Sequence, residues 1–263
     1  MLARIHAAIY APDRNRRLSH YIMAKGLFSL PEQLRKQLFI GEQYYCPICE
    51  CRLRKFLVLH RPYHLCCPIC RSLQRHRFIW LFCNSKYMKY DSSPMRMLHI
   101  APEHALSFRF AQNPDLEYLS ADLYDPTAIE RMDICDIRYP DNYFDMILCS
   151  HVLEHVIDDK RALSEFWRVL KSDGQAIILV PITTEVTFED PMITNPAQRE
   201  KIFGQHDHVR RYGCDFPERV KLANFDVKSV VPEDLVHSGD IKRLGLDSND
   251  IIFYCRKVLQ TDS

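Results

Sequence analysis

Short apolar runs alternate with stretches of helical periodicity from residue 95 to residue 257. This alternation favours a parallel β-sheet covered by helices. Residues 158–174 place their apolar side chains on one helical face, and Gly174 is available as the stop that often follows a last helical turn. Two further runs downstream would complete a seven-stranded, mostly parallel sheet. The predicted strands are residues 95–101, 117–122, 130–135, 144–150, 176–182, 225–231 and 251–257.

The first ninety residues follow a different pattern. Residues 1–45 carry apolar positions between basic ones, which is consistent with short basic amphipathic helices. Residues 71–88 again have helical periodicity, and the turn-forming run 91–94 ends it. We therefore predict three parts, which are a basic helical arm at 1–45, a cysteine-rich module with a linking helix at 46–90, and an α/β domain at 91–263.

Residues 46–70 of this module hold six of the eleven cysteines, and four of them read C-x2-C, seventeen residues, C-x2-C. This is the ligand spacing of a tetrahedral zinc site, and the alternative is disulfides. No apolar signal segment precedes the cluster, so we expect a reducing, cytoplasmic setting and a structural Zn²⁺. Cys51 and Cys66 are spare thiols, and the sequence leaves open their exchange into the ligand set. The predicted ligands are Cys46, Cys49, Cys67 and Cys70.

Charge is distributed unevenly along the chain. The net charge is +1, yet residues 1–90 hold 16 Lys and Arg against 4 Asp and Glu, whereas residues 91–263 hold 19 against 30. The resulting charges of +12 and −11 indicate an anionic partner for the N-terminal part, or docking of the two parts on each other. No apolar run approaches the roughly 20 residues of a transmembrane helix. Peripheral membrane contact of the basic arm stays open, and the sequence does not indicate an oligomeric state.

Several segments carry a resemblance to a known family. In chain order, four of them are MLHIAPEHAL, LSADLYDP, MDICDIRYPDNYFDMILCSHVLEHV and RVLKSDGQAIILVP. Together they resemble the class I S-adenosylmethionine-dependent methyltransferases across residues 95–257. With RSLQRHR after the second C-x2-C, and FEDP and FGQHDHVRRYG further on, the chain looks more narrowly like a zinc-bearing bacterial branch of that family, similar to type 11. The resemblance implies a Rossmann-like sheet, S-adenosylmethionine as cofactor and methyl transfer as activity.

The resemblance also assigns cofactor contacts. In an open α/β sheet, ligands bind beyond the carboxyl ends of the strands. Asp122, which ends the second predicted strand and precedes Leu123, would accept hydrogen bonds from both ribose hydroxyls. In the family pattern, Asp133 faces the adenine amino group, and the backbone N–H of Ile134 meets the adenine ring.

The first turn departs from the glycine-rich loop of the family, because residues 101–105 read APEHA. Ala101 still allows close approach of the backbone, whereas a positive φ would be costly at Glu103. We therefore expect a different path for this loop. The Glu103 carboxylate would face the amino group or the sulfonium end of the cofactor.

The fourth predicted strand ends at Ser150, and His151 follows it directly, beside the expected position of the methyl group. We therefore predict a cofactor contact at Ser150 and a general base at His151. The segment from His151 to His155 also spells H-x-x-E-H, a pattern of one class of zinc peptidases. Those enzymes carry the motif on a long helix, whereas here it follows a strand, so we expect Glu154 and His155 to brace the turn.

A second polar cluster lies in the insertion between the fifth and sixth predicted strands. A His-Asp pair could deprotonate a hydroxyl acceptor at neutral pH, and adjacent arginines could hold a phosphate or carboxylate. The alternative is a surface loop with satisfied polar groups. The candidates are His206 and His208 as catalytic residues, and Asp207, Arg210 and Arg211 as substrate ligands.

Two histidine clusters beside a predicted methyl site favour a hydroxyl acceptor, because an amine needs no base. The first hypothesis is O-methylation of a sugar, a glycan precursor or another small polar acceptor that carries a phosphate. The second is an RNA methyltransferase whose basic zinc module binds the nucleic acid backbone. The third is a non-catalytic binding protein with a degenerate first turn.

Overall fold

The computed structural model describes residues 26–59, 64–88 and 94–258, and these fall into two compact units. The first unit contains the described residues before 89 together with residues 103–109 and 231–250. The second contains residues 94–102, 110–230 and 251–258. The chain therefore passes repeatedly between the units. Residues 1–25 of the predicted arm and residues 91–93 of the predicted boundary lie outside the described residues.

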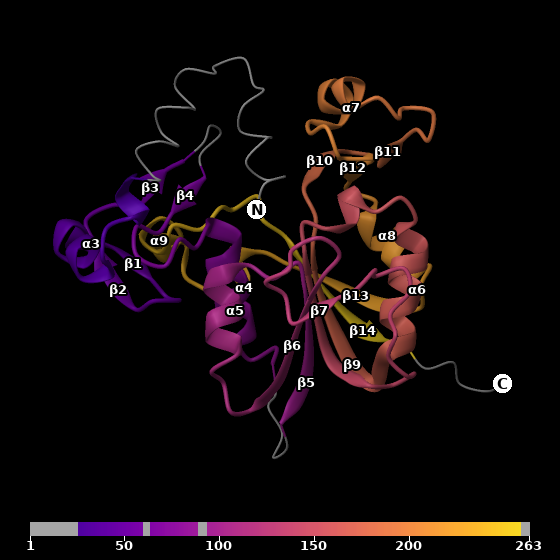
Figure 1. The fold of residues 1–263 in the computed structure, drawn as a ribbon, viewed down its shortest axis with the longest axis horizontal. Helices are drawn as coiled ribbons and strands as arrows, with labels where there is room; N and C mark the ends of the chain where they lie inside the picture. The colour runs from indigo at the N-terminus through magenta and orange to yellow at the C-terminus, as the bar shows by residue number, and fades with distance from the viewer. Residues whose placement is uncertain (1–25, 60–63, 89–93, 259–263) are drawn as a thin grey trace. The chain divides into compact units, whose positions relative to one another are not determined.

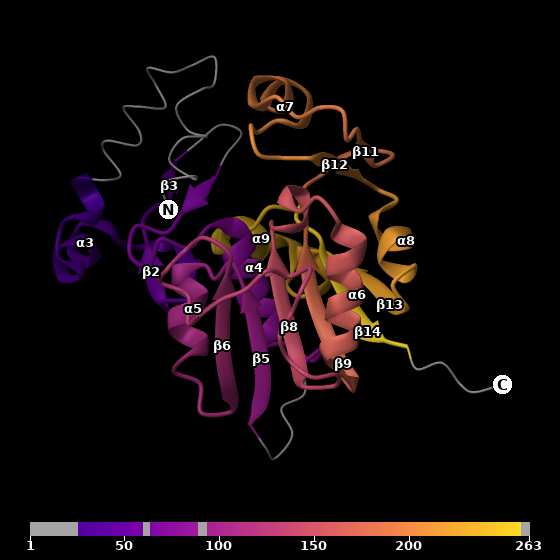
Figure 2. The same cartoon turned by 45° about the vertical axis from the view of Figure 1, so that its right-hand side comes forward.

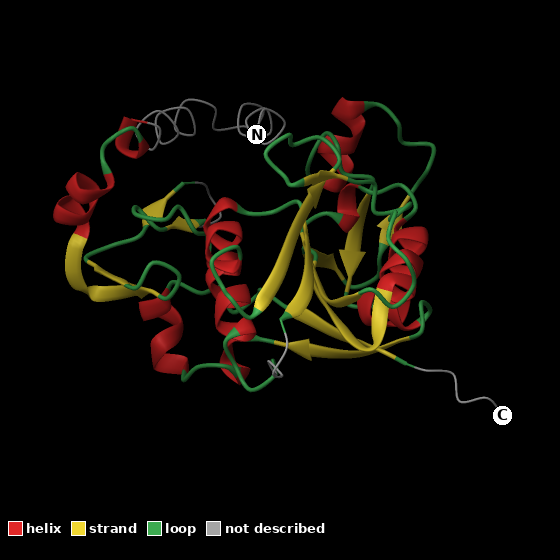
Figure 3. Cartoon of the chain, turned by 60° about the horizontal axis from the view of Figure 1, so that its bottom comes forward, coloured by secondary structure: helices red, strands yellow, loops and turns green. Residues whose placement is uncertain are grey.

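The second unit is built on a seven-stranded sheet (Figure 1) with the order β13-β14-β9-β8-β5-β6-β7. Strands β9, β8, β5, β6 and β7 are parallel, and β14 runs antiparallel to both β9 and β13. Figure 3 shows these strands fanned in a twist. The predicted seven-stranded, mostly parallel sheet is confirmed. The strands are β5 (Met95–Ile100), β6 (Leu116–Asp122), β7 (Glu130–Arg131), β8 (Phe144–Ser150), β9 (Leu170–Leu179), β13 (Phe225–Val230) and β14 (Ile252–Lys257).

The core of the second unit forms where apolar faces of the sheet and of helix α6 (Asp159–Val169) meet. Strand β8 is buried along nearly its whole length, as expected for a central parallel strand. Helix α6 begins where the Asp158 side chain accepts a hydrogen bond from the Arg161 N–H at 2.9 Å. It buries Ala162, Leu163, Phe166 and Val169 against the sheet.

The predicted stop of this helix at Gly174 is wrong. The helix ends at Val169, and the chain enters β9 directly at Leu170. Gly174 is buried within β9, beside the irregular register between the Leu170 and Gln175 pairings with β8. The strand is therefore longer at its start than the apolar run alone indicated, because residues 171–173, which follow Leu170, are polar and partly or fully exposed.

An insertion follows β9 and forms a small sheet with the order β10-β12-β11, which Figure 1 shows gathered with helix α7. Because β9 is parallel to β8 and the insertion leaves its end, the insertion begins at the carboxyl edge of the main sheet. Its elements are β10 (Ile182–Thr184), β11 (Phe188–Glu189), α7 (Pro196–Phe203), β12 (Arg210–Gly213) and α8 (Phe216–Lys221).

The first unit contains two antiparallel hairpins, β1-β2 and β3-β4. The predicted linking helix of residues 71–88 is observed as α4 (Gln74–Cys83). No helix within the described ranges is long and apolar enough to cross a membrane. The other elements are α3 (Glu32–Phe39), β1 (Ile40–Cys46), β2 (Cys51–Leu53), β3 (Leu57–Val58), β4 (Leu65–Cys66), α5 (His104–Phe110, mostly in this unit), the 3-10 helix Pro232–Asp234 and α9 (Ser238–Leu244).

Candidate functional site

Three neighbouring strands end together at the carboxyl edge of the main sheet, where Figure 2 shows β6, β5 and β8 side by side. Strand β5 pairs with β6 on one side and β8 on the other, in continuous register. Ala101, Asp122 and Ser150 therefore lie level at this edge. The structure thus brings together three of the predicted cofactor contacts, at the edge where ligands of open α/β sheets bind.

The backbone is strained where the chain leaves two of these strands. Ala101 has φ 49° and His151 has φ 54°. This left-handed conformation costs a residue with a side chain about 1–2 kcal/mol, and strained residues cluster at functional sites. Hydrogen bonds hold both turns, because the Ala101 N–H donates to the Ala121 carbonyl at 2.8 Å and the His151 N–H to the Leu179 carbonyl at 2.8 Å. The positive φ that a glycine usually supplies is thus taken by Ala101.

Glu103 belongs to the first unit. Its side chain is 2% exposed, and its Oε1 lies 3.8 Å from Nε2 of His76. The sequence signal for a cofactor contact at Glu103 was its place in the turn. Its cofactor role stays a prediction.

Asp122 has a carboxylate that the following loop holds in place. Its Oδ1 accepts hydrogen bonds from the N–H groups of Tyr124 at 2.7 Å and Asp125 at 2.8 Å. Among the described residues, no hydrogen bond reaches its Oδ2. One oxygen therefore fixes the carboxylate and the other is presented at the edge of the sheet, next to half-buried Leu123.

Asp133 and Ile134 lie in a turn after β7 and not in the strand predicted for residues 130–135. The Asp133 Oδ1 accepts a hydrogen bond from the Cys135 N–H at 2.8 Å, and the residue is exposed. Ile134 is buried. The strand is only two residues long, because the chain turns soon after it and the hydrogen bond to the Asp133 side chain stabilises that turn.

The two histidine-containing motifs, predicted separately, meet in the structure. His151 Nδ1 lies 3.2 Å from Oε1 of Glu154, and His155 Nδ1 lies 3.2 Å from Oδ2 of Asp207. The rings of His155 and His208 pack edge to face, with centroids 4.6 Å apart. We call these five residues the His–Glu–Asp cluster. The H-x-x-E-H segment forms a 3-10 helix, Leu153–His155, instead of the long helix of the peptidases.

Electrostatics within the cluster follow from burial and from these pairs. Burial alone would raise the pKa of Glu154, but the hydrogen bond with His151 and the charges of His151 and His155 outweigh it, so this pKa is lowered. Burial also opposes ionisation of Asp207, yet His155 and His206 bring its pKa down to about 2. Burial, followed by the neighbouring His155, lowers the pKa of His208. The carboxylates are therefore ionised at neutral pH.

Four buried polar atoms at this edge have no hydrogen-bond partner among the described residues. They are Ser150 Oγ, Glu154 Oε2, Asp207 Oδ1 and His208 Nε2. A buried polar atom without a partner costs about 1–3 kcal/mol, so such atoms mark places where a ligand can complete the hydrogen bonding. The sequence placed Ser150 at the edge, but it could not show that its hydroxyl is buried.

Arg210 was predicted to bind substrate, and the structure gives it a structural role instead. Its side chain is 4% exposed. Its guanidinium donates to the carbonyls of Leu153 at 2.8 Å, of Ile157 at 2.8 Å and of Val156, and to Oε2 of Glu189 at 2.8 Å. With these donors engaged, Arg210 fastens the insertion to the turn that carries His151.

The other predicted residues of this loop are more accessible. Arg211 donates to the Oγ1 and the carbonyl of Thr183, both at 3.0 Å, on the exposed side of β12. His206 Nδ1 lies 3.9 Å from Oδ1 of Asp207, and its side chain is 36% exposed. Their substrate and catalytic roles stay predictions.

A buried carboxylate that sequence reasoning missed extends this attachment. Asp159, 0% exposed, accepts hydrogen bonds from the Tyr212 hydroxyl at 2.5 Å and from Nε and Nη2 of Arg219 at 2.7 Å each. Arg219 also donates to Glu189 at 3.0 Å. The only local signal for Asp159 was its place in the first turn of a helix, where acidic residues are common.

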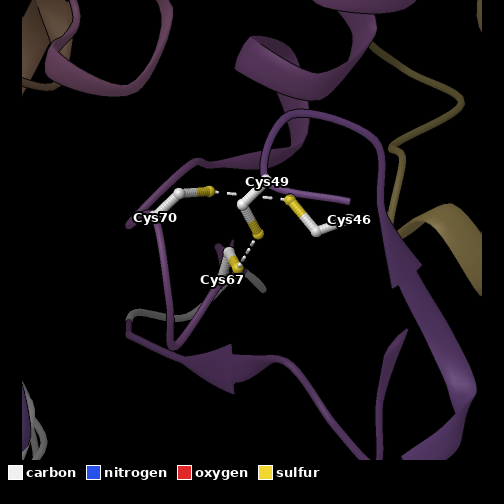
Figure 4. Close-up of side chains that lie close together, drawn as sticks. All are labelled: Cys46, Cys49, Cys67 and Cys70. Atoms are coloured by element: carbon white, nitrogen blue, oxygen red, sulfur yellow. Dashed lines mark hydrogen bonds between the residues drawn. The ribbon is translucent and has the colours of Figure 1, made fainter. Parts of the chain in front are cut away.

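The first unit holds the four predicted zinc ligands in one group, with their sulfurs pointing toward one another (Figure 4). The Sγ atoms of Cys46 and Cys70 are 3.6 Å apart, and those of Cys49 and Cys67 are 3.7 Å apart. Sulfurs on one tetrahedral Zn²⁺ lie about 3.8 Å apart, from Zn–S bonds of about 2.3 Å. The donor set and its spacing therefore fit zinc.

The spare thiols point elsewhere. Cys51 donates to the Cys49 carbonyl at 3.3 Å, and Cys66 to the Cys67 carbonyl at 3.6 Å. Burial raises the pKa of the Cys66 thiol to about 12. Neither is part of the sulfur group, which favours the ligand set predicted from spacing.

Some of the arginines of the first unit are buried and donate hydrogen bonds to carbonyls within that unit. The Arg77 guanidinium, fully buried, donates to the carbonyls of Ser72 at 2.7 Å and Leu244 at 2.8 Å. Arg35 donates to the carbonyls of Pro68 at 2.7 Å and Ile69 at 2.6 Å, within the second knuckle. The basic balance therefore reflects, in part, arginines that bind the cysteine loops.

Comparison with known proteins finds a family match for one segment of the chain. A family model described as a methyltransferase domain matches residues 103–178, which include Asp122, Ser150 and the H-x-x-E-H segment. Residues 103–178 of the chain are therefore similar to methyltransferase domains. This match agrees with the predicted methyltransferase, and the class I, S-adenosylmethionine-dependent type and the narrower zinc-bearing branch belong to the proposal below.

The relatives found by sequence align with the chain over short segments only, and the similar solved structures have low sequence identity to it. An uncharacterised protein of Methanocaldococcus jannaschii is 44% identical over 48 residues, 18% of this chain and 21% of that protein. The ubiquinone/menaquinone biosynthesis C-methyltransferase of Vibrio cholerae is 43% identical over 44 residues, 17% of each chain. These matches thus span about a fifth of each relative. A putative methyltransferase structure from Bacillus halodurans is 17% identical, covers 69% of this chain and 98% of its own, and has a TM-score of 0.44.

The structural role of Arg210 in the second unit can be measured. Arg210→Lys leaves carbonyls of the His151 turn without donors, because an ammonium cannot span them. We expect the free energy of unfolding to fall by about 3–5 kcal/mol, as when a buried ion pair is broken. Urea denaturation of the purified protein measures this change.

Arg211→Lys is the matched control, because the guanidinium of Arg211, the residue next to Arg210, is exposed. Its effect should stay within about 0.5 kcal/mol. Equal effects of the two substitutions would contradict the structural role of Arg210.

Proposed function

We propose that the chain transfers a methyl group from S-adenosylmethionine to a hydroxyl group of a small polar acceptor. The observation that carries this proposal is the position of His151 directly after β8, with its Nδ1 next to Glu154, at the edge that also presents the Asp122 carboxylate. A hydroxyl is a poor nucleophile at neutral pH, so its methylation needs a base as well as alignment.

The residues at the edge of the sheet suit the cofactor. The Oδ2 of Asp122 would accept from a ribose hydroxyl, while its Oδ1 stays bound to the loop. The buried hydroxyl of Ser150 would gain a hydrogen-bond partner. In the same proposal, Ala101 allows close approach of the backbone, and Asp133 and Ile134 contact the adenine. When bound, the cofactor supplies an electrophilic methyl group.

His151 has the geometry of a general base. Its side chain is 30% exposed, and Glu154, 1% exposed, holds its Nδ1 at 3.2 Å. The proton of the acceptor hydroxyl would pass to the imidazole as the oxygen takes the methyl group from sulfur, and the sulfonium becomes a neutral thioether. Glu154 stabilises the imidazolium formed in this step.

The acceptor class follows from the groups near this edge. Arg211 and His206 would hold an anionic substituent, which favours a sugar, a glycan precursor or another small phosphorylated acceptor. An RNA acceptor was the second hypothesis, and it rested on the basic charge of the N-terminal part. Because Arg35 and Arg77 bind carbonyls within their own unit, that charge supports RNA less than its sum indicates.

We also propose that Cys46, Cys49, Cys67 and Cys70 bind one structural Zn²⁺. The support is the sulfur spacing, which matches a tetrahedral site. Four thiolates leave no coordination position for a substrate, so the metal would stabilise the fold of the first unit and would not take part in methyl transfer.

Substitution of Asp122 tests the cofactor assignment. Asp122→Asn should weaken binding of S-adenosylmethionine by about 1–3 kcal/mol, the value for loss of a charged hydrogen-bond partner. Titration calorimetry of the purified protein measures the affinity. Asp115→Asn is the matched control, because this exposed aspartate precedes the same strand at its other end. An unchanged affinity of a folded Asp122→Asn variant would refute the ribose contact.

Substitution of His151 tests the base. His151→Asn keeps a residue that tolerates a positive φ but cannot take a proton, so kcat should fall by about 10²–10⁴-fold while cofactor affinity is retained. The assay follows methyl transfer to sugar phosphates and, in parallel, to RNA. The same change at His206 tests the other candidate base. Full activity of His151→Asn would exclude His151 from proton transfer.

Zinc binding at the cysteines predicts a metal-dependent fold. Cys46→Ser should lose one zinc per chain, and with it the folded structure of the first unit, because metal binding and folding are coupled. Cys51→Ser should keep the metal, since Cys51 lies outside the sulfur group. Metal analysis and circular dichroism give both readouts. Loss of zinc from Cys51→Ser would show that the ligand set is different.

A further inference from the structure

Within the His–Glu–Asp cluster, three side chains offer metal-ligand atoms at one point. Glu154, His155 and His208 each place one such atom within 4.8 Å of the others. Two ligands on one tetrahedral Zn²⁺ lie about 3.3–3.4 Å apart, given bonds of about 2.0–2.1 Å. A separation of 4.8 Å therefore has to shrink by about 1.4 Å, which rotation of side chains can supply.

Both imidazoles are oriented as metal-binding imidazoles are. The Nδ1 of His155 faces Oδ2 of Asp207 at 3.2 Å, and the Nδ1 of His208 faces the Phe203 carbonyl at 3.3 Å. An oxygen acceptor requires the N–H at Nδ1, so the neutral ring carries its lone pair at Nε2. Ligating histidines almost always donate their other N–H to a carboxylate or a carbonyl in this way.

Two buried polar atoms of these residues have no hydrogen-bond partner among the described residues. They are Oε2 of Glu154 and Nε2 of His208, in residues that are 1% and 6% exposed. Both carry lone pairs and neither carries a proton in this arrangement, so each requires a hydrogen-bond donor or a cation. A cation satisfies both at once. His155, with a side chain 33% exposed, leaves a path for entry.

We propose that Glu154, His155 and His208 bind one divalent transition-metal ion, for which Zn²⁺ is the best fit. Two imidazoles and one carboxylate form a donor set that zinc uses where a fourth position stays open for water or substrate. Asp207 is a positioning residue, which orients His155 from behind. This site is separate from the four cysteines, and it does not rest on the proposed methyl transfer, because binding is measured without S-adenosylmethionine.

The experiment counts metal on the full chain after dialysis against Zn²⁺. The native sequence should hold two equivalents per chain, one at the cysteines and one at this site. Glu154→Gln and His208→Ala should each hold one. Asp207→Asn, which keeps all three ligands, should bind the second equivalent about 10–100-fold more weakly, the usual effect of losing the partner of a ligating histidine.

Loading with Co²⁺ distinguishes the two sites, because thiolate ligands give charge-transfer absorption and nitrogen and oxygen ligands do not. His206→Ala is the control in the same loop, and it should keep the second equivalent. Binding of a single Co²⁺ with only thiolate bands in the native protein overturns the proposal, and so does retention of the second equivalent in folded Glu154→Gln and His208→Ala. The native count decides the question even where a variant does not fold.

Discussion

The arrangement of the candidate site in the second unit depends on the hydrogen bonds of the Arg210 guanidinium. The turn after β8 begins with a residue at positive φ and forms only a single 3-10 turn, so several of its carbonyls have no helical partner. Arg210, more than fifty residues further along the chain, donates to the carbonyls of Val156 and Ile157, and also to that of Leu153, which accepts the Val156 N–H as well. Burying a guanidinium is costly unless its donors are satisfied. Here the carbonyls and Glu189 satisfy it, and the loop with Asp207 and His208 is thereby placed against His155.

Asp159 gives this attachment its rigidity. One buried carboxylate joins the first turn of α6 to Tyr212 on β12 and to Arg219 on α8, so the helix packed on the sheet and two elements of the insertion share one set of charged hydrogen bonds. Such bonds are shorter and stronger than neutral ones. The arrangement of the His–Glu–Asp cluster therefore depends on contacts outside the cluster as well as on its own pairs. Its geometry is imposed by a neighbouring network, and this is why buried polar atoms within it can remain without hydrogen-bond partners.

The fold was readable from the sequence where the cause of structure is local. Apolar runs predicted the strands, since a central strand such as β8 is buried on both faces, and the cysteine spacing predicted the sulfur group of Figure 4. The sequence failed where the cause is distant. Arg210 looks like a substrate ligand until its acceptors are known, and Gly174 looks like a helix stop until β9 is seen to begin at Leu170. Residues 103–109 and 231–250 join the first unit through contacts that no local pattern reports.

The two histidine motifs are an intermediate case, in which the sequence showed the residues but not how they pair. Each motif was visible, and each was assigned chemistry alone, yet the pairs of His151 with Glu154 and His155 with Asp207 support different proposed roles for them. His151 is the more accessible and adjoins the end of β8, whereas His208 is buried with its Nδ1 committed to a carbonyl. A base must exchange protons with a substrate, and a metal ligand must not. Exposure and hydrogen bonding therefore separate the two roles among histidines that the sequence alone treats as equivalent.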